Sequence, residues 1–389
     1  MAGTKHVRSI HWSGPVSLSR KTEHGCIMNK SNRFFHLFQS QFATSIRLAI
    51  CSWFFCFASL SSYSHAEAPI TSSGLNTEVN LSATPPTGTV LYNITGGTRV
   101  GTNLFHSFGD FNVPSSDIAN FHNETVLPTS NILSRVTGGN PSSIFGTIRT
   151  EGFGNANLFL MNPAGIVFGP SATLNVGGSV AFTTANYLRL AEVDGSNAGI
   201  FRAETTSASL LTSASVAAFG FLGTNQAAIA VQGSTLKVQP GQSISLAGGN
   251  QGFASVPNGV TVTDGKLSAP GGQVNIASVA SRGEVMAGTL EYAPNVNVES
   301  FGALGTIKVS QESSIDVSGN GGSTVLIRSG QFVLDNDSKI SANITGPGPV
   351  INGVESIGGG IDIVVSQDAI IRNAATLENI TRAFDPLYL

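Results

Sequence analysis

Residues 157–183 read NLFLMNPAGIVFGPSATLNVGGSVAFT and carry the clearest indication of the fold. This stretch holds four short apolar runs, at residues 158–161, 166–168, 172–176 and 180–182. Only short segments rich in Asn, Pro and Gly separate these runs. Apolar runs of this length, each bounded by Asn, Pro or Gly, are typical of strands joined by tight turns. The stretch therefore predicts consecutive strands with no helix between them.

The segment Asn162-Pro163-Ala164-Gly165 has the composition of a tight corner. An Asn side chain can hydrogen-bond nearby backbone groups, Pro presets φ near −65°, and Gly allows a positive φ without a Cβ clash. The residues by themselves therefore favour a structural corner over a functional site.

The composition favours an all-β protein. Of 389 residues, 45 are Gly and only 11% are charged. A helix-rich protein of this length would need many more Glu, Lys and Arg residues on exposed helix faces. The chain is therefore expected to consist of strands and turns.

Past residue 226 the sequence repeats a short pattern of two apolar residues around one other residue. Each such triplet places two side chains on the same face of a strand. Three steps of about seven to ten residues make a coil of about 20–25 residues, which is the pattern of a β-solenoid. The triplets begin at Ile229, Leu236, Ile244, Val274, Ile307, Ile315, Val325, Phe332 and Ile361.

This repeat predicts an all-β, right-handed, single-stranded parallel β-helix. A Greek-key sandwich is the competing architecture, because it also has short strands at regular spacing. Residues 186–225 lack the pattern, and an extra-helical hairpin is expected there without a defined place. A series of Phe residues is expected to fill the interior rather than line a ligand site. These are Phe105, Phe108, Phe111, Phe121, Phe145, Phe153, Phe159, Phe168 and Phe182.

Residues 1–66 differ from the rest and are predicted to be a signal peptide with an extended n-region. They carry seven basic residues and one acid, and an apolar run at residues 48–60 that is too short to span a bilayer as a helix. Ser64-His65-Ala66 follows the run and predicts cleavage after Ala66 or Ala68. Met28 is a second candidate start, and an uncleaved membrane anchor is the alternative interpretation.

The remaining chain has no Cys, because all three Cys lie in the leader. Its stability must come from packing and strand hydrogen bonds rather than disulfides. The whole chain has 20 basic and 23 acidic residues, so removal of the leader leaves 13 basic and 22 acidic residues and a net charge of −9. This charge argues against nucleic acid and anionic membranes as partners.

No catalytic, cofactor or metal site is predicted. Beyond the leader only His106 and His122 remain, and neither has a second His or Cys at metal-ligand spacing. Nucleophile-elbow, Walker and dinucleotide-binding motifs are absent from the sequence. Asp335-Asn336-Asp337 is the best acidic cluster, and a turn is expected there in preference to a calcium site or the carboxylates of a β-helix polysaccharide lyase.

The stretch NPAGIVFGPSATLNVGGSVAF resembles the NPxGI segment of the two-partner secretion domain of filamentous-haemagglutinin-like exoproteins, also called the haemagglutination activity domain. Four earlier segments follow in the order that this family uses, and the resemblance covers residues 70–190. They are YNITGGT at 92–98, NLFHSFGDFNV at 103–113, NILSRVTGG at 131–139 and SIFGTI at 143–148.

Two positions depart from the family pattern. Ala164 stands where the family has a second Asn, and no clear copy of the NPNL motif is present. Asn140-Pro141-Ser142-Ser143 is similar to that motif but falls after the expected place, so it is given little weight.

The resemblance implies a function in secretion. Members of this family pass the inner membrane through the Sec machinery and are recognised in the periplasm by an outer-membrane β-barrel transporter with POTRA domains. They then fold as a β-helix outside the cell. By resemblance, Asn162, Pro163, Gly165 and Ile166 are the residues expected to act in transporter recognition and folding nucleation.

The resemblance also suggests how the chain is divided and where it works. Residues 67–205 are expected to form the two-partner secretion domain, and residues 206–389 a β-helix repeat region that stops in mid-coil, as in a truncated chain. The protein is expected to be a monomeric, non-enzymatic, adhesin-like module without an integral membrane anchor. It would be secreted or held at the surface of a Gram-negative-type bacterium. A secreted polysaccharide-active β-helix enzyme is the alternative, and an autotransporter passenger is disfavoured.

Overall fold

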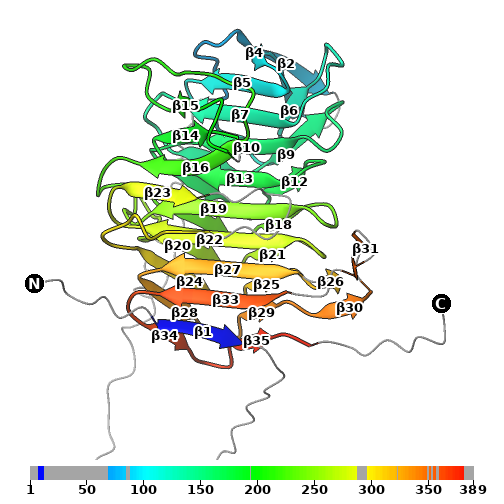
Figure 1. The fold of residues 1–389 in the computed structure, drawn as a ribbon. Coiled ribbons are helices and arrows are strands. Elements are labelled where there is room, and N and C mark those ends of the chain that lie inside the picture. The colour runs from blue at the N-terminus through cyan, green and yellow to red at the C-terminus, as the bar shows by residue number, and fades with distance from the viewer. Residues whose placement is uncertain are drawn as a thin grey trace, which may run out of the picture. The chain divides into compact units, whose positions relative to one another are not determined.

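The structure is a computed structural model that describes residues 8–12, 69–84, 88–192, 194–286, 296–321, 323–347, 350–351, 354–355 and 359–380. The described residues form strands and turns, and none of them lies in a helix (Figure 1). Accordingly, none of these residues belongs to a helix long and apolar enough to cross a membrane.

The largest sheet, sheet 1, stacks one strand from every coil. Its central strands, from β5 to β33, pair in parallel throughout. In sheet order its strands are β4 (Thr98–Val100), β5 (Asn103–Phe108), β7 (Asn131–Val136), β10 (Asn157–Met161), β13 (Val180–Thr183), β19 (Ser243–Gly249), β22 (Gln273–Val279), β27 (Thr324–Ser329), β33 (Gly360–Val365) and β1 (Arg8–Trp12).

Three further sheets close the coils. Sheet 2 contains β8 (Ser142–Ile144), β11 (Ile166–Phe168), β17 (Ile229–Gln232), β20 (Val260–Thr263), β24 (Thr306–Ser310), β28 (Gln331–Leu334) and β34 (Ala369–Ile371). Sheet 3a contains β2 (Thr77–Thr84), β3 (Thr89–Gly96), β6 (Ile118–His122), β9 (Thr147–Glu151) and β12 (Thr173–Asn175). Sheet 3b contains β18 (Thr235–Lys237), β21 (Lys266–Ser268), β25 (Ser314–Asp316), β29 (Lys339–Ser341) and β35 (Thr376–Glu378).

The chain visits these sheets in turn, which makes the fold a parallel β-helix. From β10 in sheet 1 it passes to β11 in sheet 2, to β12 in sheet 3a, and back to sheet 1 at β13, where Leu158 lies beside Val180. These four strands are the four apolar runs of residues 157–183, so the prediction of consecutive strands is confirmed. The all-β parallel β-helix predicted from the sequence is confirmed with it.

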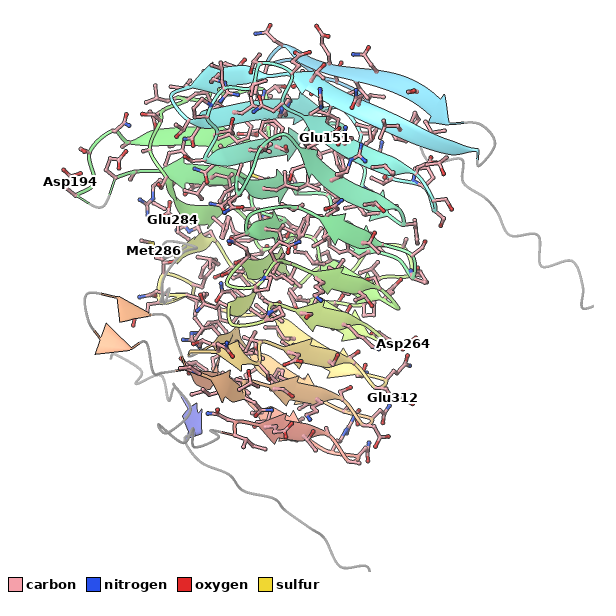
Figure 2. All side chains as sticks on the ribbon, turned by 90° about the vertical axis from the view of Figure 1, so that its right-hand side faces the viewer. Glu151, Asp194, Asp264, Glu284, Met286 and Glu312 are labelled. Atoms are coloured by element: carbon pink, nitrogen blue, oxygen red, sulfur yellow. The ribbon has the colours of Figure 1, made fainter. Side chains whose placement is uncertain are left out.

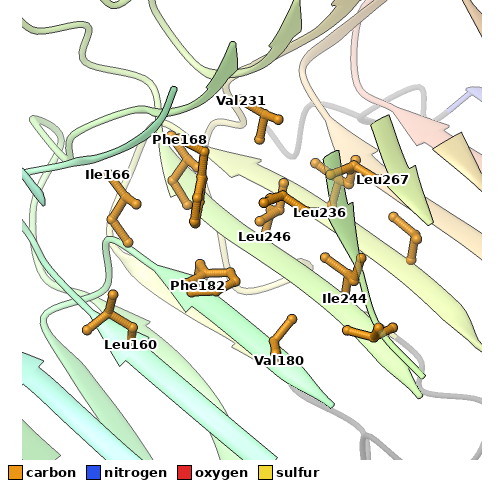
Figure 3. Packing of buried hydrophobic residues seen from close by; sticks show 14 of the residues in the cluster. Leu160, Ile166, Phe168, Val180, Phe182, Val231, Leu236, Ile244, Leu246 and Leu267 are labelled. Carbon is orange, nitrogen blue, oxygen red and sulfur yellow. The ribbon is translucent and has the colours of Figure 1, made fainter. Parts of the chain in front are cut away.

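Columns of apolar side chains fill the inside of the helix. One column in sheet 2 runs through Ile166, Ile229, Val260 and Ile307, all of them fully buried. Figure 3 shows how the columns from different sheets meet, and the rings of Phe168 and Phe182 lie edge to face with centroids 4.8 Å apart. Every predicted apolar-x-apolar triplet overlaps a strand and contributes two buried side chains to this core.

An antiparallel sheet outside the helix covers the outer face of sheet 1. This sheet 4 contains β15 (Gly199–Arg202), β14 (Tyr187–Leu190), β16 (Val216–Phe221) and β23 (Gly283–Met286). Its first three strands lie in residues 186–225, where an extra-helical hairpin was expected. The step from Val180 to its next sheet 1 partner, Ile244, is longer than the expected coil because the chain leaves the helix there.

The predicted Phe series is buried except for Phe145, which is half-buried on the outside of its coil. Phe105 and Phe159 are buried in a second cluster, between sheet 1 and sheet 4, rather than inside the helix. Phe105 contacts Phe201 of β15 with ring centroids 5.1 Å apart. The expectation of core packing therefore holds for the series with Phe145 as the exception, although the residues divide between two cores.

Antiparallel strands lie at both edges of the parallel stack. β4 pairs with β5, and β2 pairs with β3, at the N-terminal coil. β1, from the predicted leader, pairs with β33 at the last coil. Four two-residue or three-residue strands, β26 (Gly319–Asn320) with β30 (Ile344–Gly346) and β31 (Val350–Ile351) with β32 (Val354–Glu355), complete the structure.

The domain boundaries stay predictions. The apolar run at residues 48–60 and the cleavage site at Ser64-His65-Ala66 lie outside the described residues. The described residues all belong to a single compact unit.

Candidate functional site

The Asn-Pro-Ala-Gly corner joins β10 of sheet 1 to β11 of sheet 2 as a β-turn. The amide N–H of Gly165 donates to the carbonyl oxygen of Asn162 at 3.1 Å. Ala164 keeps a negative φ, so the turn belongs to the class that favours Asn first, Pro second and Gly fourth. Gly165 has φ +121°, as the composition of the corner predicts.

The side chain of Asn162 is buried, with 1% exposure, and its polar atoms are satisfied. Its Oδ1 accepts from the N–H of Ala164 at 3.0 Å. Its Nδ2 donates to the carbonyl oxygen of Asn140 and to Oγ of Ser142, both at 2.9 Å. The backbone N–H of Asn162 donates to the carbonyl oxygen of Thr183 at 2.9 Å. Asn162 therefore joins its own coil to the coil before it and to the coil after it.

Two features of the structure require glycine at position 165. Its φ lies in the region that side-chain-bearing residues rarely adopt. A Cβ at this position would also fall on the ring of Phe253. Any other residue would have to change the backbone and displace that ring.

Ile166 is the first residue of β11 and has no exposed surface. Its register partners are Ser142 in the coil before and Ile229 in the coil after. The residue directly after the corner therefore lies in the apolar column of sheet 2.

The structure brings the four predicted site residues together in one corner and buries three of them. Asn162, Gly165 and Ile166 are buried, whereas Pro163 and its neighbour Ala164 are half-buried. In the folded coil, only Pro163 and Ala164 present surface that a partner could touch.

A ladder of three asparagines at the start of sheet 1 was not predicted from the sequence; Asn103 and Asn131 are buried and Asn157 is half-buried. Asn131 Nδ2 donates to Oδ1 of Asn103 at 2.9 Å, and Asn157 Nδ2 donates to Oδ1 of Asn131 at 3.1 Å. The ladder ends where Oδ1 of Asn157 accepts from the N–H of Ser179 at 3.0 Å. The signal was present as three Asn residues that each precede two apolar residues, in NLF, NIL and NLF.

His106 is buried in the first coil and is held neutral. Its side chain has 1% exposure, and its Nδ1 lies 3.3 Å from Oγ1 of Thr77. Burial lowers the pKa of His106 from 6.5 to about 3, with a smaller contribution from the positive charge of Arg99. The ring packs among Phe108 and Phe121, so His106 is a core residue.

The acidic cluster at residues 335–337 forms a turn, as the sequence predicts. Asn336 and Asp337 both have positive φ, near +50° and +55°. Asp335 is held by its own chain, with Oδ2 2.9 Å from Arg372 Nη2 and Oδ1 2.7 Å from Asn373 Nδ2. Within the described parts of the chain, no three His, Cys, Asp or Glu side chains lie close enough together to hold a metal ion.

The outer face of sheet 4 carries a groove of about 770 Å³ beside Glu284 and Met286, which Figure 2 labels on β23. Glu284 accepts from the hydroxyl of Tyr187 at 2.9 Å and forms an ion pair with Arg189 at 2.9 Å. Burial, together with the hydrogen bond to Glu284, raises the pKa of Tyr187 to about 12. Side chains of its own chain, Tyr187 and Arg189, therefore bind the Glu284 carboxylate.

Comparisons with known proteins place these features in a family context. The family model described as TPS secretion domain matches residues 69–327. The chain is similar in structure to the filamentous hemagglutinin secretion domain, with 16% identity and a TM-score of 0.41, over 81% of this chain and 100% of that chain. It is also similar to the HMW1 secretion domain from Haemophilus influenzae, with 15% identity and a TM-score of 0.28, over 80% of this chain and 100% of that chain. No curated protein matches the sequence.

Proposed function

Because the chain belongs to the TPS secretion domain family, whose model spans residues 69–327, we propose that it is the N-terminal secretion module of an adhesin-like exoprotein. Exoproteins of this family are secreted by two-partner systems, in which an outer-membrane transporter is the partner. We infer that this chain reaches the periplasm through the Sec machinery and is bound there by a cognate transporter with POTRA domains. It would then be released to the medium or held at the cell surface.

The proposed role of the corner is to start folding. Asn162 makes hydrogen bonds to three successive coils, and this is the observation that carries the proposal. A buried polar group left without its partner costs about 1–3 kcal/mol, so a coil that lacks Asn162 would close poorly on its neighbours. Ile166 then begins the apolar column on which each later coil is added.

Because the corner is buried in the folded chain, we infer that the transporter recognises it before it folds. Asn162 and Ile166 have almost no surface in the folded coil, so their side chains are available to a transporter only before the coil closes. We propose that the transporter binds this segment while the chain is still extended. Burial of the apolar columns outside the cell would then supply the free energy that draws the chain across, without nucleotide hydrolysis.

The predicted division of the chain enters the proposal unchanged. Residues 1–66 would act as the signal peptide, residues 67–205 as the two-partner secretion domain and residues 206–389 as β-helix repeats. The TPS secretion domain family is not an enzyme family. The carboxylates of Glu284 and Asp335 are bound by side chains of their own chain, which supports the secretion module over the polysaccharide-active alternative.

Export tests the proposal. The full chain is expressed in a Gram-negative host with or without the cognate transporter, and the cleaved chain is measured in the medium and in the periplasm. The proposal expects the chain in the medium only when the transporter is present. Equal amounts in the medium under both conditions would overturn it.

A further inference from the structure

A small apolar cluster lies outside the helix, next to the Asn162 corner. Val167 of β11, together with Ala228 and Ala230 of the β17 segment, faces away from the main core. These three side chains are buried because Val256 and Phe253 cover them. We call the surface formed by Val167, Ala228 and Ala230 the outer patch, and residues 252–256, which cover it, the strap.

The strap is a tight loop with few ties to the patch beneath it. Phe253 and Val256 exchange two backbone hydrogen bonds, at 3.2 and 2.7 Å. Ala254, between them, has φ +45°, an uncommon conformation for a residue with a Cβ. Backbone hydrogen bonds to the β17 segment flank the strap on both sides: the N–H of Ala228 donates to the carbonyl oxygen of Gln251 at 2.8 Å, and the N–H of Ile229 donates to that of Gly259 at 3.3 Å. The N–H of Gly252 also donates to Oδ1 of Asn258 at 2.9 Å. Its contact with β11 is made by apolar side chains.

Phe253 fills a socket that Gly165 creates. A Cβ on Gly165 would fall on the Cε1 and Cζ atoms of the Phe253 ring, so the ring sits directly against the glycine backbone. The socket adjoins Pro163 and Ala164, the part of the corner that keeps some surface. Gly165 is one residue from Ala164 and two from Val167, so along the chain the socket lies between the exposed part of the corner and the outer patch.

The order of the chain means that this surface forms before its cover. β11 and β17 pair with each other through Val167 and Ala230, and both precede the strap in the sequence. Until residues 252–256 arrive, the apolar outer patch and the socket face solvent. Contiguous exposed apolar surface of this kind marks interaction sites.

We propose that the cognate transporter holds the outer patch during export, with an aromatic side chain in the Gly165 socket, and that closure of Phe253 over the socket releases it. This inference rests on the proposed function. The occupant is an apolar, aromatic-bearing segment of the transporter because the socket accepts a phenyl ring in the folded chain. Phe253 and the transporter compete for one site, so release is coupled to completion of the coil that carries the strap.

Residence on the transporter tests the proposal. The full chain is pulse-labelled in cells that carry a tagged transporter, and the fraction of chain that copurifies with the tag is followed over time. Phe253→Ala removes the competing ring and is expected to prolong the complex several-fold. Phe301→Ala is the matched control, because it removes a phenyl group from the other outer cluster, between sheets 1 and 4. It is expected to leave the residence time at the wild-type value.

Trypsin resistance of the released chain reports whether Phe253→Ala folds. If it does not fold, a second variant still tests the proposal. Ala254→Gly retains the phenyl ring and relieves the positive φ of the strap, so it is expected to speed closure and shorten the complex. A benzophenone on Ala164→Cys, the only thiol after the predicted leader, should cross-link to the transporter before release and not after.

The outcomes separate this inference from the function on which it rests. If wild-type export does not depend on the transporter, the proposed function fails. If export depends on the transporter but both strap variants stay on the transporter for as long as the wild type does, the strap inference alone fails. A cross-link that persists in the released chain would also overturn the strap inference.

Discussion

The side-chain amide of Asn162 donates a hydrogen bond to the main-chain carbonyl oxygen of Asn140, 2.9 Å away. Each of these asparagines precedes a proline at the passage from sheet 1 to sheet 2, so two Asn-Pro corners follow each other in successive coils. Asn140-Pro141, the weak match to the NPNL motif, therefore forms the corner of the preceding coil and accepts a hydrogen bond from Asn162.

Asn162→Ala should destabilise the folded chain by about 1–3 kcal/mol, because it leaves the buried hydroxyl of Ser142 and the half-buried N–H of Ala164 without their partner. Urea unfolding measures the change. Asn140→Ala is the matched control: it keeps the carbonyl that Asn162 uses and removes only an exposed amide that bonds Asp110. The control should change the stability by less than about 0.5 kcal/mol. Equal losses in the two variants would contradict the role of Asn162.

Gly165→Val should impair secretion more than Ala164→Asn. Valine at φ +121° costs about 1–3 kcal/mol in backbone strain, and its Cβ also displaces the ring of Phe253. Ala164 is half-buried with an ordinary φ, so an Asn side chain is tolerated there. The measurement is the secreted amount of each variant, and equal secretion would show that the corner geometry does not matter.

The free energy of unfolding should fall as the pH is lowered from 6.5 toward 3, because of His106. The pKa of its side chain is about 3 in the folded chain and near 6.5 when unfolded. Between these values the unfolded chain binds the extra proton, so this contribution is complete above pH 6.5 and is lost as pH falls toward 3. The slope approaches about 1.4 kcal/mol per pH unit. Urea unfolding at pH 7.5, 5.5 and 4.5 should show a weaker pH dependence for His106→Gln than for the wild type, and identical slopes would refute the assignment.

Asn131→Ala should destabilise the first coils, because Asn131 both donates to Asn103 and accepts from Asn157 in the buried ladder. A loss of about 1–3 kcal/mol is expected. Asn175→Ala, on an exposed position of β12, is the control and should be near neutral. If thermal unfolding gives the same midpoint for both variants, the ladder does not stabilise the coils.

Local pattern was sufficient to predict the helix itself. The alternation in Ile307-Lys308-Val309 or Ile361-Asp362-Ile363 fixes which side chains face inward, and Gly165 could be assigned a positive φ from the turn composition alone. These features depend on residues that are neighbours in the sequence. They could therefore be predicted from the sequence without knowledge of the fold.

Contacts between distant segments were not predictable from local pattern. Phe105 packs on Phe201 because sheet 4 folds back over sheet 1, and Gly165 meets Phe253 because a later loop crosses its corner. The burial of Asn162 has the same origin, since its partners lie in other coils. Neither the second core nor the strap has a periodic signature in the sequence.

The role of Asn162 in export can be measured as transporter-dependent secretion of the two asparagine variants. Cells with and without the cognate transporter would express the wild type, Asn162→Ala and Asn140→Ala, and the cleaved chain would be measured in the medium after a pulse. We predict that the wild type and Asn140→Ala appear in the medium only with the transporter, whereas Asn162→Ala is largely retained in the periplasm. Secretion of Asn162→Ala at the wild-type level, or secretion of any of the three without the transporter, would contradict the claim.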